Sequence, residues 1–334
     1  MLTDQFKALG FDELCQRLCE NKKTLIIYHV RSDADAVGSA FALRDIFSDM
    51  GIPSYCACSD EIPERLQFLA DGAQGSVLLE EGLRLDYERI ISVDSASPSQ
   101  LGELFFRLHK DIDIMIDHHA HGTVYADHYV DASAAATGEI IYRIAKRLFE
   151  MGELCRVSDR VINCVYAAIS SDTGGFKFAN ATPDTHRMAA ELIEAGVDSA
   201  DINKKLFDSK SLKQIKAEGE AINRLKIHAG GRIASTVFPY EVKRALGLSG
   251  EHLETLIDIP RSVSGAEVAF CVKQEEFEGP YRVSMRSASE FDVADVCALF
   301  GGGGHKRAAG CSVKAANIDE AEEKILREIL KKMK

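Results

Sequence analysis

The sequence lacks the features that would mark a membrane protein or a disulfide-bonded scaffold. No apolar run approaches the length that spans a bilayer. The N-terminus mixes acids and bases, and it has neither the basic start nor the apolar core of a signal peptide. The nine cysteines are odd in number and form no CxxC pair, which argues against a disulfide framework and a zinc knuckle. We therefore expect a cytoplasmic protein without a membrane partner.

The sequence also has fewer basic than acidic residues. The 40 lysines and arginines are outnumbered by 52 aspartates and glutamates, which gives a net charge of −12. Long nucleic acid is bound mainly through cations that neutralise many phosphates, so this balance argues against such a partner. A short or small anionic substrate stays compatible with the composition wherever cations cluster locally.

The chain is long enough for two domains with separate cores, since 46% of its 334 residues are hydrophobic. In the first half, short apolar runs alternate with amphipathic stretches. The apolar runs predict strands at 25–28, 54–58, 89–93 and 112–116. The amphipathic stretches predict helices at 37–50, 63–69, 101–108, 135–149, 159–170 and 183–194. This alternation predicts an α/β fold with a doubly wound, mainly parallel sheet.

The sequence pattern changes from helical to strand-like near residue 225. Residues 202–225 are charged and helical in pattern, with no strand nearby. After them, two short strands flank Ala-Gly-Gly at 229–231 as a hairpin, and further strands are predicted at 266–273 and 281–287. We expect three parts: an N-terminal domain at 1–198, a helical connector at 199–225, and a smaller C-terminal α/β domain at 226–334.

Imidazole and carboxylate side chains follow several elements of the first domain at the point where each element ends. They are His29, Asp33, Asp35, Asp94, Asp117, His118, His119 and Asp172. Each one taken alone is readable as a turn, capping or core residue. In an open α/β sheet, however, ligands bind beyond the carboxyl ends of the strands. The combination therefore predicts a single site at that edge.

Mixed imidazole and carboxylate ligands favour Mn²⁺ and also admit Zn²⁺, Co²⁺ or Fe²⁺. A carboxylate such as Asp94 is able to bridge two ions. Two divalent ions activate a water molecule, orient a phosphate and neutralise the leaving oxygen of an in-line displacement. The predicted chemistry is therefore two-metal hydrolysis of a phosphoester.

These motifs resemble those of the DHH phosphoesterase superfamily, and the resemblance extends over nearly the whole chain. The matching segments, in order, are His29–Ser39, Asp94, Asp117-His118-His119 and Ser171–Gly174, the last continuing through Phe176, Phe178 and Asn180. The sequence departs from the family pattern at Arg31-Ser32, where many relatives have a proline-containing turn, and at Ala34, where glycine is common. No ligand position is lost.

The resemblance implies a role for each of these positions. His29, Asp33 and Asp94 would bind one metal ion. The other ion would be bound by Asp35, Asp94, His118 and Asp172. His119 would face the phosphate, and Asp117 would orient a neighbouring imidazole, because metal-bound histidines commonly donate their other N–H to a carboxylate.

The C-terminal part resembles the DHH-associated domain through its glycine-rich run, Gly301–Gly310. Glycines let backbone N–H groups approach an anion closely, and the basic residues that follow supply positive donors. The resemblance implies substrate contacts from Arg286, Ser287, Gly303, Gly304, His305 and Lys306. Arg261 and Lys273 are weaker candidates that are equally readable as surface charges.

The size of the chain and this C-terminal run are similar to those of family members that hydrolyse short RNA and 3′-phosphoadenosine 5′-phosphate. Within the superfamily, the alternative is a phosphodiesterase for pApA or cyclic di-AMP. An exonuclease for long single-stranded DNA is disfavoured by the net acidity. A different class of function is a non-catalytic nucleotide sensor, which loss of ligands would support. Two-fold homo-oligomers are the usual assembly of proteins, which makes a homodimer the default expectation.

Overall fold

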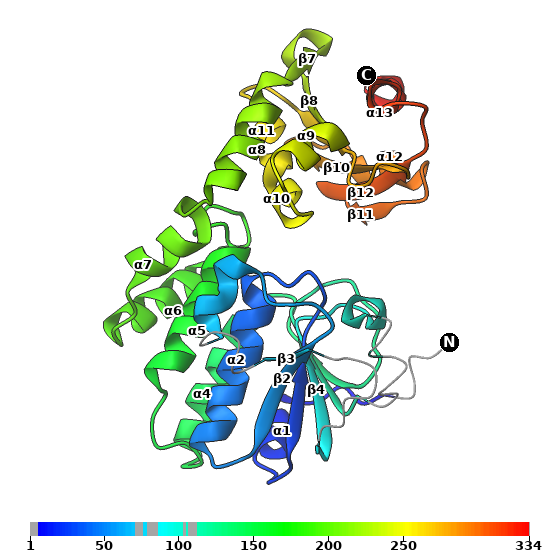
Figure 1. Ribbon diagram of the computed structural model, residues 1–334. Helices are drawn as coiled ribbons and strands as arrows, with labels where there is room; N and C mark the ends of the chain where they lie inside the picture. Colours follow the sequence, from blue (N-terminus) through cyan, green and yellow to red (C-terminus); the bar gives the residue numbers. More distant parts are fainter. Residues whose placement is uncertain (1–5, 71–75, 79–85, 103–104, 106–111, 334) are drawn as a thin grey trace. The chain divides into compact units, whose positions relative to one another are not determined.

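The computed structural model describes residues 6–70, 76–78, 86–102, 105 and 112–333 (Figure 1). The chain divides into two compact units, Met1–Ser209 and Lys210–Lys334. This division lies inside the stretch that the sequence analysis assigned to a connector. None of the helices in the described ranges is long and apolar enough to cross a membrane.

The first unit contains a six-stranded sheet in which all neighbouring strands are parallel. Its strands, in spatial order, are β3 (Ser76–Leu78), β2 (Ser54–Cys58), β1 (Thr24–Ile27), β4 (Arg89–Val93), β5 (Ile114–Asp117) and β6 (Asp127–Val130). The order 3-2-1-4-5-6 is that of a doubly wound fold whose direction reverses between β1 and β4. The predicted α/β class with a mainly parallel sheet is therefore confirmed.

The two outer strands were not predicted from the sequence. β3 has only three residues, and the residues of β6 are half-buried or exposed, so neither strand has the continuous apolar run of a central parallel strand. The helix predicted at 63–69 is present as a 3-10 helix, η1 (Glu64–Leu69). The helix predicted at 101–108 lies mostly outside the described residues.

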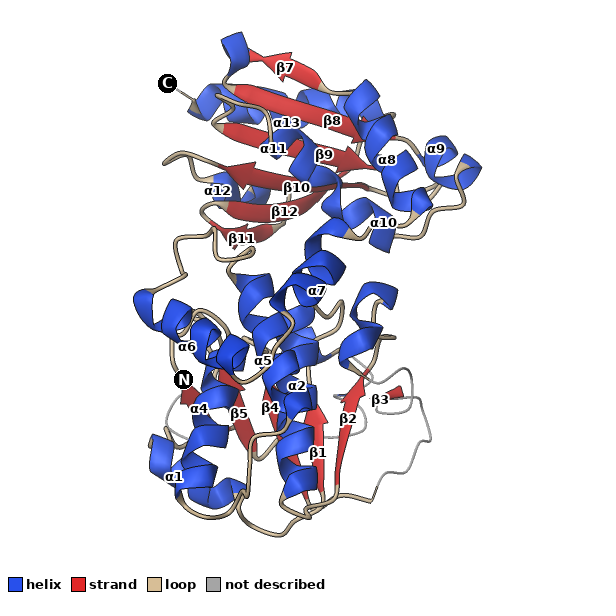
Figure 2. Cartoon of the chain, turned by 90° about the vertical axis from the view of Figure 1, so that its left-hand side faces the viewer, coloured by secondary structure: helices blue, strands red, loops and turns tan. Residues whose placement is uncertain are grey.

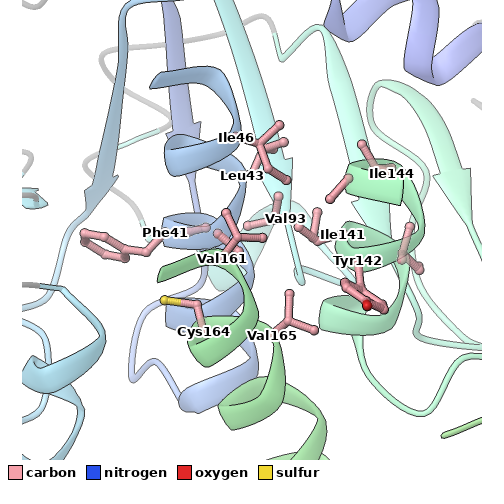
Figure 3. Packing of buried hydrophobic residues seen from close by; sticks show 14 of the residues in the cluster. Phe41, Leu43, Ile46, Val93, Ile141, Tyr142, Ile144, Val161, Cys164 and Val165 are labelled. Carbon is pink, nitrogen blue, oxygen red and sulfur yellow. The ribbon is translucent and has the colours of Figure 1, made fainter. Parts of the chain in front are cut away.

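Three long helices pack on one face of this sheet (Figures 1 and 2). They are α2 (Ala34–Asp49), α4 (Thr137–Glu150) and α5 (Asp159–Asp172). Figure 3 shows buried side chains of all three helices in one cluster, among them Leu43 of α2, Ile141 of α4 and Val161 of α5. At Gly38 the helices approach so closely that an added Cβ would lie 2.6 Å from the carbonyl oxygen of Cys164. The bare backbone at Gly38 therefore keeps the start of α2 close to α5.

The described residues of the first unit form further helices. They are α1 (Phe11–Leu18), η3 (Pro98–Leu101), α6 (Pro183–Glu194), α7 (Ser199–Asn203) and the π-helical turn η4 (Lys204–Asp208). The continuous helical pattern expected over 202–225 is interrupted between η4 and α8 (Leu212–Asn223). The hydroxyl of Ser211 accepts a hydrogen bond from the N–H of Gln214, so α8 starts as a separate, capped helix.

The second unit has its own six-stranded sheet, which is mixed (Figure 2). Its strands, in spatial order, are β11 (Gly303–His305), β12 (Ala308–Val313), β10 (Tyr281–Ser287), β9 (Val268–Lys273), β8 (Ile233–Phe238) and β7 (Lys226–His228). Only β8 and β9 run parallel. The predicted hairpin is confirmed, since β7 and β8 are antiparallel and are joined through η5 (Ala229–Gly231).

Helices cover the two faces of the second sheet unequally. One face carries an apolar core that extends from β8 to β12 and packs against α12 (Val293–Ala298) and α13 (Ile318–Lys332). On the other face, a smaller core joins β8 and β9 to α8, and further short helices lie there. These are α10 (Glu251–Glu254), η6 (Thr255–Ile257) and α11 (Asp258–Arg261), with α9 (Tyr240–Ala245) following β8.

Candidate metal centre

Four neighbouring segments bring carboxylates and imidazoles together in the first unit. They follow β1, β4 and β5 at their carboxyl ends, and the fourth is the C-terminal end of α5. Because β1 and β4 are adjacent in the sheet, the two loops diverge at the reversal of strand order, which is where open α/β sheets bind ligands.

The first ligand group consists of His29, Asp33 and Asp94, whose candidate ligand atoms lie within 4.8 Å of one another. The Nε2 atom of His29 is 3.8 Å from Oδ1 of Asp33 and 3.6 Å from Oδ2 of Asp94. Oδ1 of Asp33 also accepts hydrogen bonds from the first N–H groups of α2, so this residue is both a helix cap and a potential ligand. The capping interpretation and the ligand interpretation of Asp33 are therefore compatible.

The second ligand group consists of Asp35, His118 and Asp172. The Nε2 atom of His118 is 3.7 Å from Oδ2 of Asp35 and 3.3 Å from Oδ2 of Asp172. The same nitrogen is 3.7 Å from Oδ1 of Asp94. The two oxygens of Asp94 therefore face different histidines, which is the arrangement that a bridging carboxylate needs.

His119 and Asp117 lie within hydrogen-bond distance, and His119 also forms a third candidate ligand group with Asp94 and His118. The buried carboxylate of Asp117 is 2.7 Å from Nδ1 of His119 and accepts a hydrogen bond from the backbone N–H of His118. The hydrogen bond to Asp117 raises the pKa of His119 despite the opposing effect of burial. Nδ1 of His119 is also 3.8 Å from Oδ1 of Asp94.

The two remaining histidines have the ring orientation that metal ligands show. Nδ1 of His29 is 2.9 Å from the carbonyl oxygen of Val30, and Nδ1 of His118 is 3.3 Å from that of Ala134. A backbone carbonyl at Nδ1 favours the tautomer whose proton lies there, which leaves the lone pair of Nε2 for an ion.

The residues that hold the carboxylates in place were not predicted from the sequence. The backbone N–H groups of Thr137 and Gly138, at the start of α4, donate hydrogen bonds of 2.7 and 2.9 Å to Asp35. The hydroxyl of Thr137 donates a bond of 2.9 Å to Asp94, and that of Ser39 donates one of 2.9 Å to Asp35. The only sequence signal was the predicted start of a helix near residue 135, since helix N-termini present free N–H groups to anions.

Backbone strain concentrates in the segments that carry ligands. Among the described residues, four non-glycine residues have a positive φ, and three of them, Arg31, Asp94 and Phe176, lie within four residues of a candidate ligand or are one. At Arg31 the φ of 54° is accompanied by a 2.7 Å hydrogen bond from its N–H to Asp60. Strain of this kind typically clusters at functional sites.

The charges of the cluster fit divalent cations. Burial, together with repulsion from neighbouring carboxylates, raises the pKa values of Asp35 and Asp172 well above their usual range. Burial alone would raise the pKa of Asp94 and lower that of His29. The contact between the two outweighs burial, lowering the pKa of Asp94 and raising that of His29 to about 9. A bound cation would relieve the carboxylate repulsion, and oxygen with imidazole donors suits Mn²⁺ and similar ions.

In the second unit, two of the expected substrate contacts lie on one face of the sheet. Arg286 of β10 and His305 of β11 both pair with Ala308 of the intervening β12. Directly opposed residues of antiparallel strands point to the same face, so the two side chains flank a small residue two strand spacings apart. On this face of the sheet, the short helices pack over β8 and β9. The strands β10, β12 and β11 follow β9 in the spatial order of the sheet.

The other expected substrate contacts differ in whether they already have a partner within the protein. Lys306 forms a 2.6 Å ion pair with the solvent-exposed Glu290. The hydroxyl of Ser287 donates a hydrogen bond to the carbonyl of Ser289. An added Cβ at Gly304, where φ is 140°, would lie 2.5 Å from the carbonyl oxygen of Ala308, whereas Gly303 has open space around it. The glycine at 304 is therefore needed for the hairpin itself, apart from any role in binding an anion.

Comparisons with known proteins find similarity in both units. The family model described as DHH family, N-terminal domain, matches residues 23–169, and the DHHA1 domain matches residues 236–332. The chain is similar to the bifunctional oligoribonuclease and PAP phosphatase NrnA of Thermus thermophilus, with 29% identity over 305 residues, 90% of this chain and 87% of that protein. It is also similar to the protein of the same name from Bacillus subtilis, with 28% identity over 305 residues, 90% and 91% of the two chains.

A solved structure shares the fold over 96% of this chain. It is an exopolyphosphatase-related protein from Bacteroides fragilis, with a TM-score of 0.86, 21% identity, and coverage of 96% of this chain and 95% of that one. This likeness concerns the fold alone.

Proposed function

We propose that this chain is a divalent-metal-dependent phosphoesterase that acts on short nucleotides. The matches to the DHH family N-terminal domain and to the DHHA1 domain support this proposal. Its substrates are short oligoribonucleotides, cleaved to mononucleotides, and 3′-phosphoadenosine 5′-phosphate, cleaved to AMP and phosphate. The observation that carries the proposal is the position of Asp94, whose two carboxylate oxygens face His29 and His118 in two different ligand groups. The similarity to two proteins named as oligoribonucleases and PAP phosphatases supports the choice of substrates.

We assign the ions to Mn²⁺. One ion would be held by His29, Asp33 and Asp94. The other would be held by Asp35, His118 and Asp172, with Asp94 shared. When bound, two such ions supply activation of a water molecule and neutralisation of charge on the phosphate.

The chain's own groups do the positioning. Asp117 holds the ring of His119 and raises its pKa, so that the imidazole is able to donate a hydrogen bond to a phosphate oxygen. The start of α4 directs two N–H groups at Asp35, and this keeps a buried carboxylate in a fixed orientation. A fixed ligand frame costs no reorganisation during the reaction.

The second unit supplies contacts to a further phosphate of the substrate. Arg286 is suited to a bidentate phosphate contact, and His305 lies on the same face of the sheet. Gly303 has room for close approach of an anion to the backbone. We assign Gly304 and Ser287 to the same set of substrate contacts. Lys306 has to leave its ion pair with Glu290 in order to contact the substrate. Breaking this pair costs little free energy because both side chains are exposed to solvent.

The test is hydrolysis by purified protein with added Mn²⁺, using RNA of two to five nucleotides, 3′-phosphoadenosine 5′-phosphate, pApA and cyclic di-AMP as substrates. Turnover of short RNA and the bisphosphate is expected. A strong preference for cyclic di-AMP or pApA would reassign the protein to messenger degradation. Binding of these nucleotides without any turnover, in protein shown to hold metal, would replace the enzyme by a sensor.

A further inference from the structure

Asp94 has a backbone conformation that requires support. Its φ is 52°, in the left-handed region that most residues with a side chain avoid. The side chain is almost completely buried, and its orientation toward both ligand groups depends on this turn of the backbone. The N–H of Asp94 is held by the carbonyl of Ile116 on β5, at 3.0 Å.

A second support comes from Tyr125, which lies 31 residues further along the chain in the segment that follows Asp117-His118-His119. The Tyr125 hydroxyl donates a 2.9 Å hydrogen bond to the carbonyl of Ser95 and lies 2.7 Å from the hydroxyl of Ser92. The phenol has one proton, which the carbonyl takes, so Ser92 is the donor of the other bond. The Tyr125 hydroxyl is thus hydrogen-bonded to the chain on both sides of Asp94, at Ser92 and at Ser95.

The backbone of the same segment packs on the turn that follows Asp94. The N–H of Thr123 donates a 2.8 Å hydrogen bond to the carbonyl of Ala96. At Gly122 an added Cβ would lie only 2.5 Å from the same carbonyl oxygen. Residues 117–125 therefore carry two of the site's imidazoles at one end and contact the Asp94 turn at the other.

We propose that Tyr125 is a positioning residue that holds Asp94 in the orientation in which its carboxylate is shared between two metal ions. The inference rests on the proposed function and deepens it, because it assigns the control of the bridging ligand to a residue outside the four motifs. Without the Tyr125 hydroxyl, the turn at Asp94 relaxes toward a less strained conformation. The carboxylate then serves one ion better than two.

The test compares Tyr125→Phe with the wild-type protein. This substitution keeps the ring and its packing and removes only the hydroxyl. Mn²⁺ binding is measured by calorimetric titration, and electron paramagnetic resonance reports whether two bound Mn²⁺ ions are magnetically coupled through a shared ligand. We expect the weaker of two Mn²⁺ affinities to fall by about 10-fold or more, as is typical when a residue that supports a metal ligand is changed. We also expect the coupled signal to decrease.

Tyr129→Phe is the matched control. Tyr129 lies four residues along on β6, where its ring packs against Phe11 with centroids 5.6 Å apart, so the change removes a phenolic hydroxyl away from Asp94. A purely structural role of Tyr125 would lower the melting temperature and leave the magnetic coupling intact. Ser92→Ala removes the hydroxyl that is hydrogen-bonded to Tyr125. It is also expected to weaken Mn²⁺ binding and the magnetic coupling, and it replaces Tyr125→Phe as the test if that variant does not fold.

Two results would overturn the inference in distinguishable ways. If the wild-type protein binds and couples two Mn²⁺ ions and Tyr125→Phe does the same with equal affinity, the positioning role is wrong while the proposed function stands. If the wild-type protein binds no pair of ions, the proposed function fails and the inference fails with it.

Discussion

The carboxylate of Asp35 accepts a 2.7 Å hydrogen bond from the backbone N–H of Thr137, a residue 102 positions away in the sequence. This bond joins the N-terminal end of α2 to the N-terminal end of α4. The positive ends of two helices therefore meet at a buried cluster of carboxylates. Helix N-termini stabilise negative charge, so the cluster is supported from the protein side as well as by any bound cation.

The hydroxyl of Thr137 gives the first prediction. It donates a hydrogen bond to Asp94, and Thr137→Val removes that donor while keeping the shape of the side chain and the backbone N–H that holds Asp35. We expect kcat to fall by about 10-fold, because a ligand loses a partner that orients it. Thr137→Ser retains the hydroxyl and is expected to keep most of the activity. Steady-state kinetics of both variants at saturating Mn²⁺ decides this, and equal rates for the two would contradict it.

Loss of the shared carboxylate is a stronger perturbation. We expect Asp94→Ala to lower turnover by at least about 100-fold, since a group that stabilises transition-state charge is removed with the shared ligand. Mn²⁺ is expected to raise the melting temperature of the wild-type protein, because an ion that binds only the folded state stabilises it. Asp94→Ala should show a smaller rise, measured by thermal unfolding with and without chelator.

Asp131 offers a matched control for that variant. It also follows a strand of the same sheet, β6, but its carboxylate contacts Ser133 and Arg143. Asp131→Ala is expected to keep the stabilisation by Mn²⁺. A loss as large as that in Asp94→Ala would mean that the effect reflects negative charge at the sheet edge and not a specific ligand.

Arg286 is predicted to act on substrate binding. We expect Arg286→Ala to raise KM for 3′-phosphoadenosine 5′-phosphate by about 10-fold or more and to change kcat much less, because the contact is made to a phosphate that does not react. Arg282, on the same face of β10 and four residues away, is the control, since its Nε lies 3.6 Å from Oε1 of Glu275 in a partly exposed ion pair. A fall in kcat with an unchanged KM would contradict the assigned role of Arg286.

The pH dependence of stability is predicted at Asp127, away from the metal centre. Its carboxylate accepts a 2.9 Å hydrogen bond from the N–H of Lys7 and pairs with Arg17 at 2.7 Å. These contacts, the backbone bond first, lower the pKa of Asp127. A lowered pKa in the folded state adds stability above the unfolded pKa of about 3.9, and this stability is lost as the pH falls through the folded value.

We therefore expect Asp127→Asn to be less stable than the wild-type protein at pH 7, by about 1 kcal/mol or less because the pair is partly exposed to solvent. The difference in free energy of unfolding should shrink as the pH falls below the unfolded pKa of about 3.9 and disappear only below the lowered pKa of the folded carboxyl. Urea unfolding of the first unit at several pH values measures it. A difference that does not change with pH would show that charge is not involved.

Much of the fold was predictable because its signals are local. The central strands β1, β4 and β5 are buried at every residue, and β2 is buried over its last three residues, so each includes a short apolar run that the sequence shows directly. The outer strands β3 and β6 escaped prediction, because edge positions do not demand such a run. The break before α8 depends on one capping hydroxyl, that of Ser211, within a stretch whose periodicity is otherwise helical.

For the candidate site, the sequence alone determined which chemical groups stand at the ends of strands, since parallel strands end at the same edge of a sheet. Only the tertiary structure decided which of them meet, because that follows from the spatial order of the strands. The order places β1 beside β4, and so His29 beside Asp94. The supports from Thr137 and Tyr125 bridge distant parts of the chain and leave no local pattern. Hydrogen bonds of this kind depend on packing between elements, and a linear sequence does not display it.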